Sequence, residues 1–416
     1  MNSDPRLGST LPKLHSRAWP LLILGGVLSA AHIWKLAGAL PELLATFQMS
    51  LVSAGVLFAI IQAASIVGGL PTAWLAGAVG VKRLACGGLV LLAVASAAGA
   101  GVDSYLALVL LRGLEGVGFL VFTVLAPSLI AAHAAPLQRD FAVGAWAMFQ
   151  GIAAFLGLAL TPIVLTVMSW RTWWLILALA TLVLSLVLTL ALPPDAQRPA
   201  PGDGAGSGGR WGLSGVLASL KTGRIWLAGV AFACYSGPWL AVLGFLPTVF
   251  DGVDSIGPGF VGLLAGMVGL ANAAGALLGA RLMHAGMRIT RLVQWCFGGT
   301  ALSIICAFAV DMHTSAQVIW VTCWLAVFSA LGGIIAAALT RLGVTITPRS
   351  SSPPVTFGLM QQIFNVGNLV GPPLLAIIVG AVGGWQGSMV LVGAAAALGI
   401  SCVLLIAHLL RPPAAE

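Results

Sequence analysis

Residues 19–40 read WPLLILGGVLSAAHIWKLAGAL, and Lys35 is the only formally charged residue among them. A helix needs about 20 mostly apolar residues to cross the hydrocarbon core of a bilayer. Similar apolar stretches follow along the chain. Together with the first they cover residues 19–40, 51–74, 84–101, 105–130, 141–167, 173–192, 225–250, 259–283, 292–310, 316–342, 355–380 and 385–410. The sequence therefore predicts twelve membrane-spanning helices.

The composition also indicates a chain that is embedded in lipid. Of its 416 residues, 59% are hydrophobic and 7% are charged, whereas soluble globular proteins carry about 25% charged residues. We therefore expect an all-α membrane protein and not an enzyme. The net charge of +8 comes from cations scattered in short loops, so we expect no nucleic-acid partner. The 6 cysteines lie in apolar runs without a C-x-x-C pair, which predicts neither disulfides nor a metal site.

The basic residues predict how the spans are oriented. If both termini are cytoplasmic, three of the 19 lysines and arginines lie outside cytoplasmic segments, and the other 16 lie within them. The three are Arg171 in an outer loop and Lys35 and Arg112 within spans. This distribution follows the positive-inside rule and predicts a multi-pass protein of a bacterial inner membrane with both termini in the cytoplasm.

One long polar stretch divides the chain near its middle. It contains Pro-Pro-Asp at 193–195 and Pro-Gly-Asp-Gly-Ala-Gly-Ser-Gly-Gly at 201–209, a composition that favours a flexible linker. The predicted segments are a cytoplasmic N-terminus at 1–18, a six-helix bundle at 19–192, a cytoplasmic linker at 193–224, a second six-helix bundle at 225–410 and a cytoplasmic C-terminus at 411–416.

The two predicted bundles repeat each other in sequence. Gly-Ala-Leu-Pro at 38–41 corresponds to Gly-Phe-Leu-Pro at 244–247, an offset of 206 residues (247 − 41). Further matched pairs are Gly80 with Gly286, Lys82 with Arg288, Gly157 with Gly367, Pro162 with Pro372, and Trp170 with Trp385. Parallel repeats of this kind are typical of secondary transporters.

Three motifs resemble those of the major facilitator superfamily. Residues 75–83 read LAGAVGVKR, which is similar to that family's loop motif G-x-L-A-D-R-x-G-R-R. Residues 112–118 read RGLEGVG, which is similar to its R-x-x-x-G-x-G motif. Residues 367–373 read GNLVGPP and carry its glycine-proline pattern. The resemblance covers essentially the whole chain.

The resemblance implies two pseudo-symmetric six-helix bundles that work by alternating access around a central site, mostly as a monomer. In the loop motif Gly80, Lys82 and Arg83 match, and the resemblance implies a gating role for them. The acidic position of that motif is Gly77 here, so the family's charged lock between neighbouring helices lacks its acid.

Three charged residues lie well inside the predicted spans: Lys35, Arg112 and Glu115. A charge in a span costs about 2.5–3.5 kcal/mol on insertion scales, so it usually faces a cavity. Lys35 and Arg112 lie at a similar depth, roughly 7 Å outward from the midplane, which predicts a site for an anion such as a carboxylate. Glu115 lies one turn from Arg112 and is our proton-coupling candidate. The alternatives are a Lys35 that reaches the membrane interface and a permanent Arg112–Glu115 ion pair.

Polar and aromatic residues within the spans complete the predicted substrate site. The further candidates are His32, Gln62, Trp146, Gln150, Tyr235, Trp239, Asn272, Gln361, Asn365 and Asn368. Packing between helices is the alternative role for each. Gly237 and Pro238 lie midway along residues 225–250, where a proline permits a kink and therefore a gating movement.

The expected function is proton-coupled uptake of a small organic anion. The alternative is a proton-driven exporter of amphipathic or drug-like compounds, and a third hypothesis is a membrane sensor that binds a ligand without moving it. No Walker-type glycine loop is found, so ATP is not the expected energy source, and we expect no cofactor. The expected partners are a small-molecule substrate, protons and membrane lipid.

Overall fold

A computed structural model describes residues 18–138, 142, 145–146, 148–195, 213–250, 257–310, 314–351 and 353–410. Most of the predicted N-terminal segment, most of the linker and the C-terminal segment lie outside these residues. So do seven cations that were counted for the orientation: Arg6, Lys13, Arg17, Arg139, Arg198, Arg210 and Arg411.

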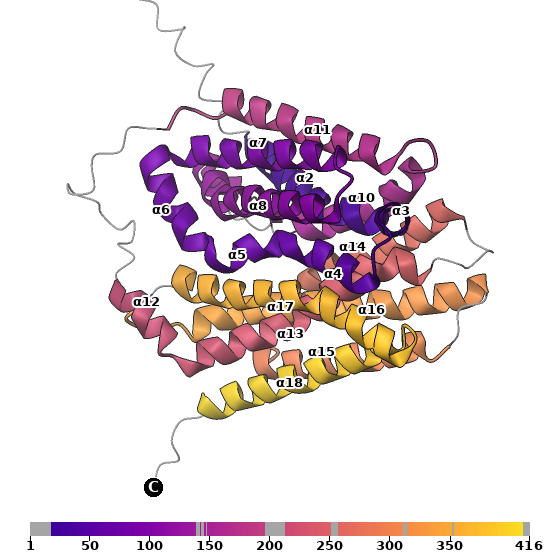
Figure 1. The fold of residues 1–416 in the computed structure, drawn as a ribbon. Helices are drawn as coiled ribbons and strands as arrows, with labels where there is room; N and C mark the ends of the chain where they lie inside the picture. Colours follow the sequence, from indigo (N-terminus) through magenta and orange to yellow (C-terminus); the bar gives the residue numbers. More distant parts are fainter. Residues whose placement is uncertain are drawn as a thin grey trace, which may run out of the picture.

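The N-terminal half consists of helices α2 to α11 (Figure 1). Their bounds are α2 (Trp19–Gly38), α3 (Leu40–Phe47), α4 (Leu51–Ala59), the 3₁₀ turn η2 (Ile60–Gln62), α5 (Ala63–Val67), α6 (Gly69–Val79), α7 (Val81–Ala100), α8 (Tyr105–His133), the 3₁₀ turn η3 (Pro136–Gln138), α10 (Phe149–Val164) and α11 (Trp170–Ala191).

The C-terminal half is built from α13 to α18, and the short α12 precedes it. Their bounds are α12 (Leu213–Leu220), α13 (Gly223–Val249), α14 (Pro258–His284), α15 (Ile289–Phe308), α16 (Ser315–Thr345), α17 (Pro353–Val382) and α18 (Gly387–Leu409). Ten helices in the described part of the chain are long and apolar enough to cross a membrane. Together with α10 and the broken second span they are consistent with twelve spans.

The second predicted span, 51–74, is interrupted in the structure. After α4, η2 and α5 the helix breaks at Gly68, and α6 then continues to Val79. The cause is Pro71, which has no N–H to donate to the carbonyl of Val67. The predicted span therefore consists of several helical segments, and the proline that separates two of them was visible in the sequence.

The composition of the linker suggested an irregular segment, but part of the linker is helical. Its last part forms α12, in which Leu213, Val216, Leu217 and Leu220 recur at helical spacing. Two hydrogen bonds fix this helix. Ser219 Oγ lies 2.7 Å from Ser351 Oγ, and Trp226 Nε1 donates to the carbonyl oxygen of Leu220 at 2.8 Å.

Figure 1 shows the two halves as two layers, one indigo to magenta and the other pink to yellow. Small residues allow their closest approach. A β-carbon at Gly266 of α14 would come within 2.9 Å of α10, and one at Gly55 of α4 within 2.9 Å of Pro372 of α17. Such glycines let helix backbones approach closely in a membrane. The end of the helices that carries α12 is called the linker end here, and the opposite end is the α3 end.

Candidate functional site

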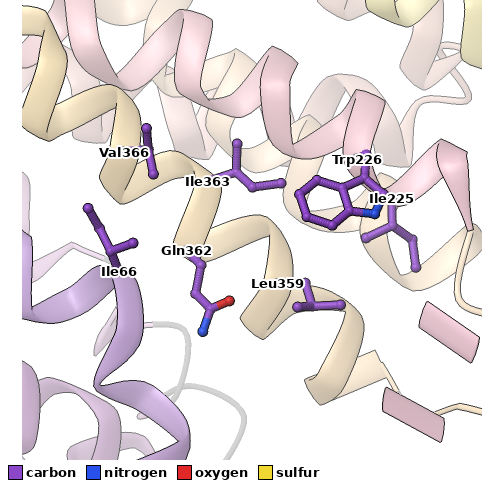
Figure 2. A pocket seen from close by; sticks show the side chains of 7 residues that line it. All are labelled: Ile66, Ile225, Trp226, Leu359, Gln362, Ile363 and Val366. Carbon is purple, nitrogen blue, oxygen red and sulfur yellow. The ribbon is translucent and has the colours of Figure 1, made fainter. Parts of the chain in front are cut away.

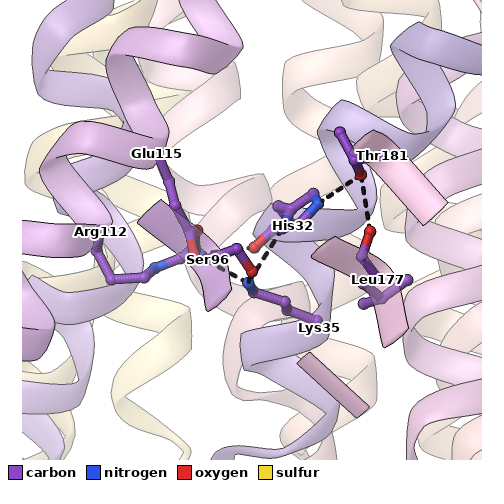
Figure 3. A network of polar contacts seen from close by, with 7 residues as sticks. All are labelled: His32, Lys35, Ser96, Arg112, Glu115, Leu177 and Thr181. Carbon is purple, nitrogen blue, oxygen red and sulfur yellow. Dashed lines mark hydrogen bonds and ion pairs between the residues drawn. The ribbon is translucent and has the colours of Figure 1, made fainter. Parts of the chain in front are cut away.

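The charged residues of the spans meet in one cluster inside the N-terminal half. This charged cluster consists of Lys35 of α2 and of Arg112 and Glu115 of α8, and each side chain is at most 1% exposed. Glu115 Oε1 accepts a hydrogen bond from Lys35 Nζ at 3.0 Å, and Oε2 accepts one from Arg112 Nη1. The two cations therefore share one carboxylate (Figure 3).

Lys35 uses all of its donors within the N-terminal half. Besides Glu115, its Nζ bonds Ser96 Oγ of α7 at 2.6 Å and His32 Nδ1 at 3.1 Å. The same nitrogen lies 4.0 Å from the ring centre of Trp174 on α11, a cation–π contact. An ammonium group has three protons, so none is left for a substrate in this state. Lys35 is buried in this network and does not reach outward to the surface, and its predicted role in substrate binding stays a prediction.

The hydrogen-bond pattern fixes the tautomer of His32. Thr181 Oγ1 donates its single proton to the carbonyl oxygen of Leu177 at 2.8 Å. It must therefore accept from His32 Nε2, which lies 2.9 Å away. His32 Nδ1 is then the acceptor for the ammonium of Lys35, and a neutral imidazole satisfies the whole chain of bonds.

Arg112 has one occupied and one free edge. Its Nη1 donates to Glu115 and to the carbonyl oxygen of His32, the latter at 2.7 Å. Nε and Nη2 are buried and have no hydrogen-bond partner among the described protein atoms. These two nitrogens form the side-on edge of the guanidinium group, and their parallel N–H bonds match the two oxygens of a carboxylate.

A second polar group lies in the C-terminal half and joins three of the predicted residues. Asn272 Nδ2 of α14 donates to Tyr235 Oη of α13 at 2.9 Å and to the carbonyl oxygen of Ser329 at 3.0 Å. Trp239 Nε1 donates to Ser329 Oγ at 2.9 Å. The α13 helix runs through Pro238 without interruption.

The two groups meet across the interface through aromatic rings and amides. Trp34, which neighbours Lys35 in α2, contacts Trp239 edge to face with ring centres 5.5 Å apart. Asn365 Nδ2 of α17 donates to the carbonyl oxygen of Ser65 at 3.3 Å. Asn368 is also buried. These contacts join the N-terminal half to α13 and α17.

Other predicted residues take no part in the hydrogen bonds described above. Trp146 stacks on Phe149 with ring centres 4.5 Å apart and belongs to a separate hydrophobic cluster with Phe122. Gln62 is buried in η2. Gln150 and Gln361 are partly buried. Gly237 of α13 packs directly against Gly367 of α17, so this glycine allows a close helix contact.

The loop motif at residues 75–83 is hydrogen-bonded to Asp195, a residue to which the sequence pattern had assigned no role. Asp195 accepts from the backbone N–H groups of Lys82 at 2.9 Å and Arg83 at 3.1 Å. Lys82 Nζ donates to the carbonyl oxygen of Leu192, and Gly80 makes the turn with φ 103°. A carboxylate at a helix N-terminus is stabilising. The carboxylate at this motif thus comes from Asp195, which follows α11, and not from position 77, which is glycine. Asp195 links α7 to α11 within the N-terminal half.

Comparison with known proteins identifies the family. The profile described as Major Facilitator Superfamily matches residues 22–323, more than half of the chain. Two inward-facing crystal structures of a bacterial homologue of the human lysosomal transporter Spinster are similar in fold. The unoccupied form has a TM-score of 0.78 and 16% identity and covers 99% of this chain and 100% of its own. The occupied form has a TM-score of 0.72 and 16% identity and covers 98% and 100%. No curated protein sequence matches significantly. The chain belongs to the Major Facilitator Superfamily.

Proposed function

We propose that this secondary transporter moves a small carboxylate together with a proton, with Arg112 as the anion receptor and Glu115 as the proton carrier. The free, buried Nε–Nη2 edge of Arg112 carries this proposal. Buried donors without partners are costly, and a bidentate carboxylate satisfies both of them. Because Arg112 is fully buried here, binding requires another arrangement of the halves, which alternating access supplies.

The charge of the cluster explains why proton and anion would travel together. With Lys35 and Arg112 charged, Glu115 ionised and His32 neutral, the net charge is +1. A proton alone raises this charge to +2, and a buried unpaired charge is strongly unfavourable. One proton and one monovalent anion together leave the charge at +1. Two neighbouring carboxylates also favour the state in which one of them is protonated.

We further propose that the protein lies in a bacterial inner membrane as a monomer with both termini in the cytoplasm. The distribution of lysine and arginine supports this orientation. It makes the linker end cytoplasmic, and the α3 end then faces outward.

Transport into proteoliposomes tests the proposed coupling. Radiolabelled benzoate and lactate are the probes, with an inward proton gradient as the driving force. We expect uptake by the wild type and none by Arg112→Lys, because an ammonium group cannot replace the bidentate edge. We expect Glu115→Gln to exchange the acid without a response to the gradient. Retained label separates transport from simple sensing, and uptake by Arg112→Lys at the wild-type rate would contradict the proposal.

The second candidate function is export of amphipathic compounds. The aromatic contacts of Trp34 with Trp239 and Phe58 at the interface favour it, because such rings bind apolar surfaces. Ethidium expelled in exchange for protons that enter down their gradient, with no uptake of either acid, would support this function and exclude the first.

A further inference from the structure

The C-terminal half carries cations at its linker end without an acid to pair with them. From residue 213 to residue 410 the sequence has only three acids, Asp251, Asp254 and Asp311. None of them lies within α13–α18. The cations at this end are Lys221, Arg224, Arg281, Arg288, Arg291, Arg341 and Arg349, and none forms an ion pair among the described residues. This end is therefore a strongly positive surface.

A groove opens between α5 of one half and α13 and α17 of the other (Figure 2). Its volume is about 190 Å³. Ile66 of α5 forms one wall, and Trp226 of α13 with Leu359 and Val366 of α17 forms the other. Gln362 is the one polar residue that lines it. A cavity with this lining suits an unbranched hydrocarbon better than a polar solute.

The exposed valines of α17 show that the other half does not cover this side of the helix. Val366 and Val370 lie one turn apart and are 40% and 49% exposed. At the next turn Pro372 lies against Gly55 of α4, so the halves are in contact there. A side chain that stays exposed where the halves touch points away from their interface. The stripe of α17 that lines the groove is therefore accessible, as the binding of a lipid chain requires.

The groove and the cations meet at Trp226. Its Nε1 donates to the carbonyl oxygen of Leu220 at 2.8 Å, which brings Lys221 and Arg224 to the same end of the groove. Tryptophan and basic side chains are typical of the headgroup level of a membrane. We propose that this groove binds one acyl chain of an anionic phospholipid, whose phosphate is held by Lys221 and Arg224. The site is independent of the proposed carboxylate transport.

Trp226 provides its own optical reporter. The full-length protein is placed in phosphatidylcholine nanodiscs that contain a few mole per cent of either brominated phosphatidylglycerol or brominated phosphatidylcholine. The fluorescence of Trp226 is obtained as the difference between the emission of the wild type and that of Trp226→Phe. We expect phosphatidylglycerol to quench it several-fold more than phosphatidylcholine does. Trp320 is the matched control because it is also 47% exposed and also bonds a carbonyl oxygen; both lipids should quench it equally.

A pair of charge variants separates a specific site from a general positive field. Lys221→Gln with Arg224→Gln should abolish the preference for phosphatidylglycerol at Trp226. Arg288→Gln with Arg291→Gln removes the same charge from the same end of the half, away from the groove, and should leave the preference unchanged. Equal quenching by the two lipids in the wild type, or equal loss in both double variants, would overturn the proposal.

Discussion

In the N-terminal half, His32 and Thr181 hold Lys35 in a charged network, whereas the corresponding positions of the C-terminal half carry no charge. The offset of 206 residues relates His32 to Pro238 and Lys35 to Ala241. The Trp170–Trp385 match gives an offset of 215 (385 − 170), which relates Thr181 to Ala396. Pro238 and Ala396 line a cavity of about 10 Å³ whose walls are mostly apolar.

The two repeats therefore share their helix packing but not their charged side chains. Matched glycines and prolines keep similar helix contacts in both halves, while the buried charged side chains of the described residues all lie in one. In the proposed mechanism, a proton that binds Glu115 would therefore act directly on the N-terminal half alone. The C-terminal half would then respond through contacts such as Trp34 with Trp239. The predictions below test this asymmetry.

The largest expected effect is the loss of the shared carboxylate. Glu115→Leu leaves two buried cations unpaired, and removal of one partner of a buried pair costs about 3–5 kcal/mol. Thermal unfolding of the purified protein measures this loss. Ser329→Ala, which removes a hydrogen bond from the uncharged network of the other half, should cost less. An equal or smaller loss in Glu115→Leu would contradict the asymmetry.

Alanine in place of a matched glycine should destabilise the protein equally in either half. A β-carbon at Gly157 would lie 2.4 Å from Trp34 Cβ, and one at the matched Gly367 would lie 2.6 Å from the carbonyl oxygen of Ala233. Each alanine substitution should cost about 1–3 kcal/mol through overpacking. Gly393→Ala is the control, because nothing lies within 4 Å of its β-carbon. A loss in one half only would show that the repeat does not preserve packing.

The tautomer of His32 depends on Thr181. Thr181→Val leaves the Nε2–H of His32 buried without an acceptor, which costs about 1–3 kcal/mol. Thr181→Ser retains the acceptor and should unfold near the wild-type temperature. If valine and serine behave alike in thermal unfolding, the bond from His32 to Thr181 does not set the tautomer.

The smallest effect is expected at the loop motif. Asp195→Ala removes the acceptor from the first turn of α7, and loss of a helix cap costs about 0.5–2 kcal/mol. The described residues of the C-terminal half include no Asp or Glu, so the matched start of α15 has no carboxylate from its own half to lose. Asp103→Ala is the control, because Asp103 is 91% exposed in its pair with Arg171 and such pairs contribute little. A greater loss in Asp103→Ala would contradict the capping role.

Much of the fold follows from the sequence, because a long apolar run in lipid has one stable form. Residues 19–40 were predicted as a span, and α2 covers Trp19–Gly38. The break at Gly68 was missed because hydropathy alone does not register a missing N–H at Pro71. The α12 helix was missed because the glycines before it dominated the composition of the linker.

The site was predictable in residue type but not in geometry. The three buried charges stood out in the sequence. Which way Lys35 points depends on the rotation of α2 against α7 and α11, and that rotation is set by packing between distant segments. Asp195 lies 113 residues from Lys82, so no local pattern connects them. Whether Arg112 binds an anion remains a prediction.

The most direct test of the central claim is the number of protons taken up when a carboxylate binds. Purified protein in weakly buffered detergent is mixed with benzoate, and a pH indicator reports proton uptake while calorimetry reports binding. The account predicts one proton for each bound anion in the wild type and none in Glu115→Gln. Benzoate binding without proton uptake, or the same uptake in both proteins, would contradict it.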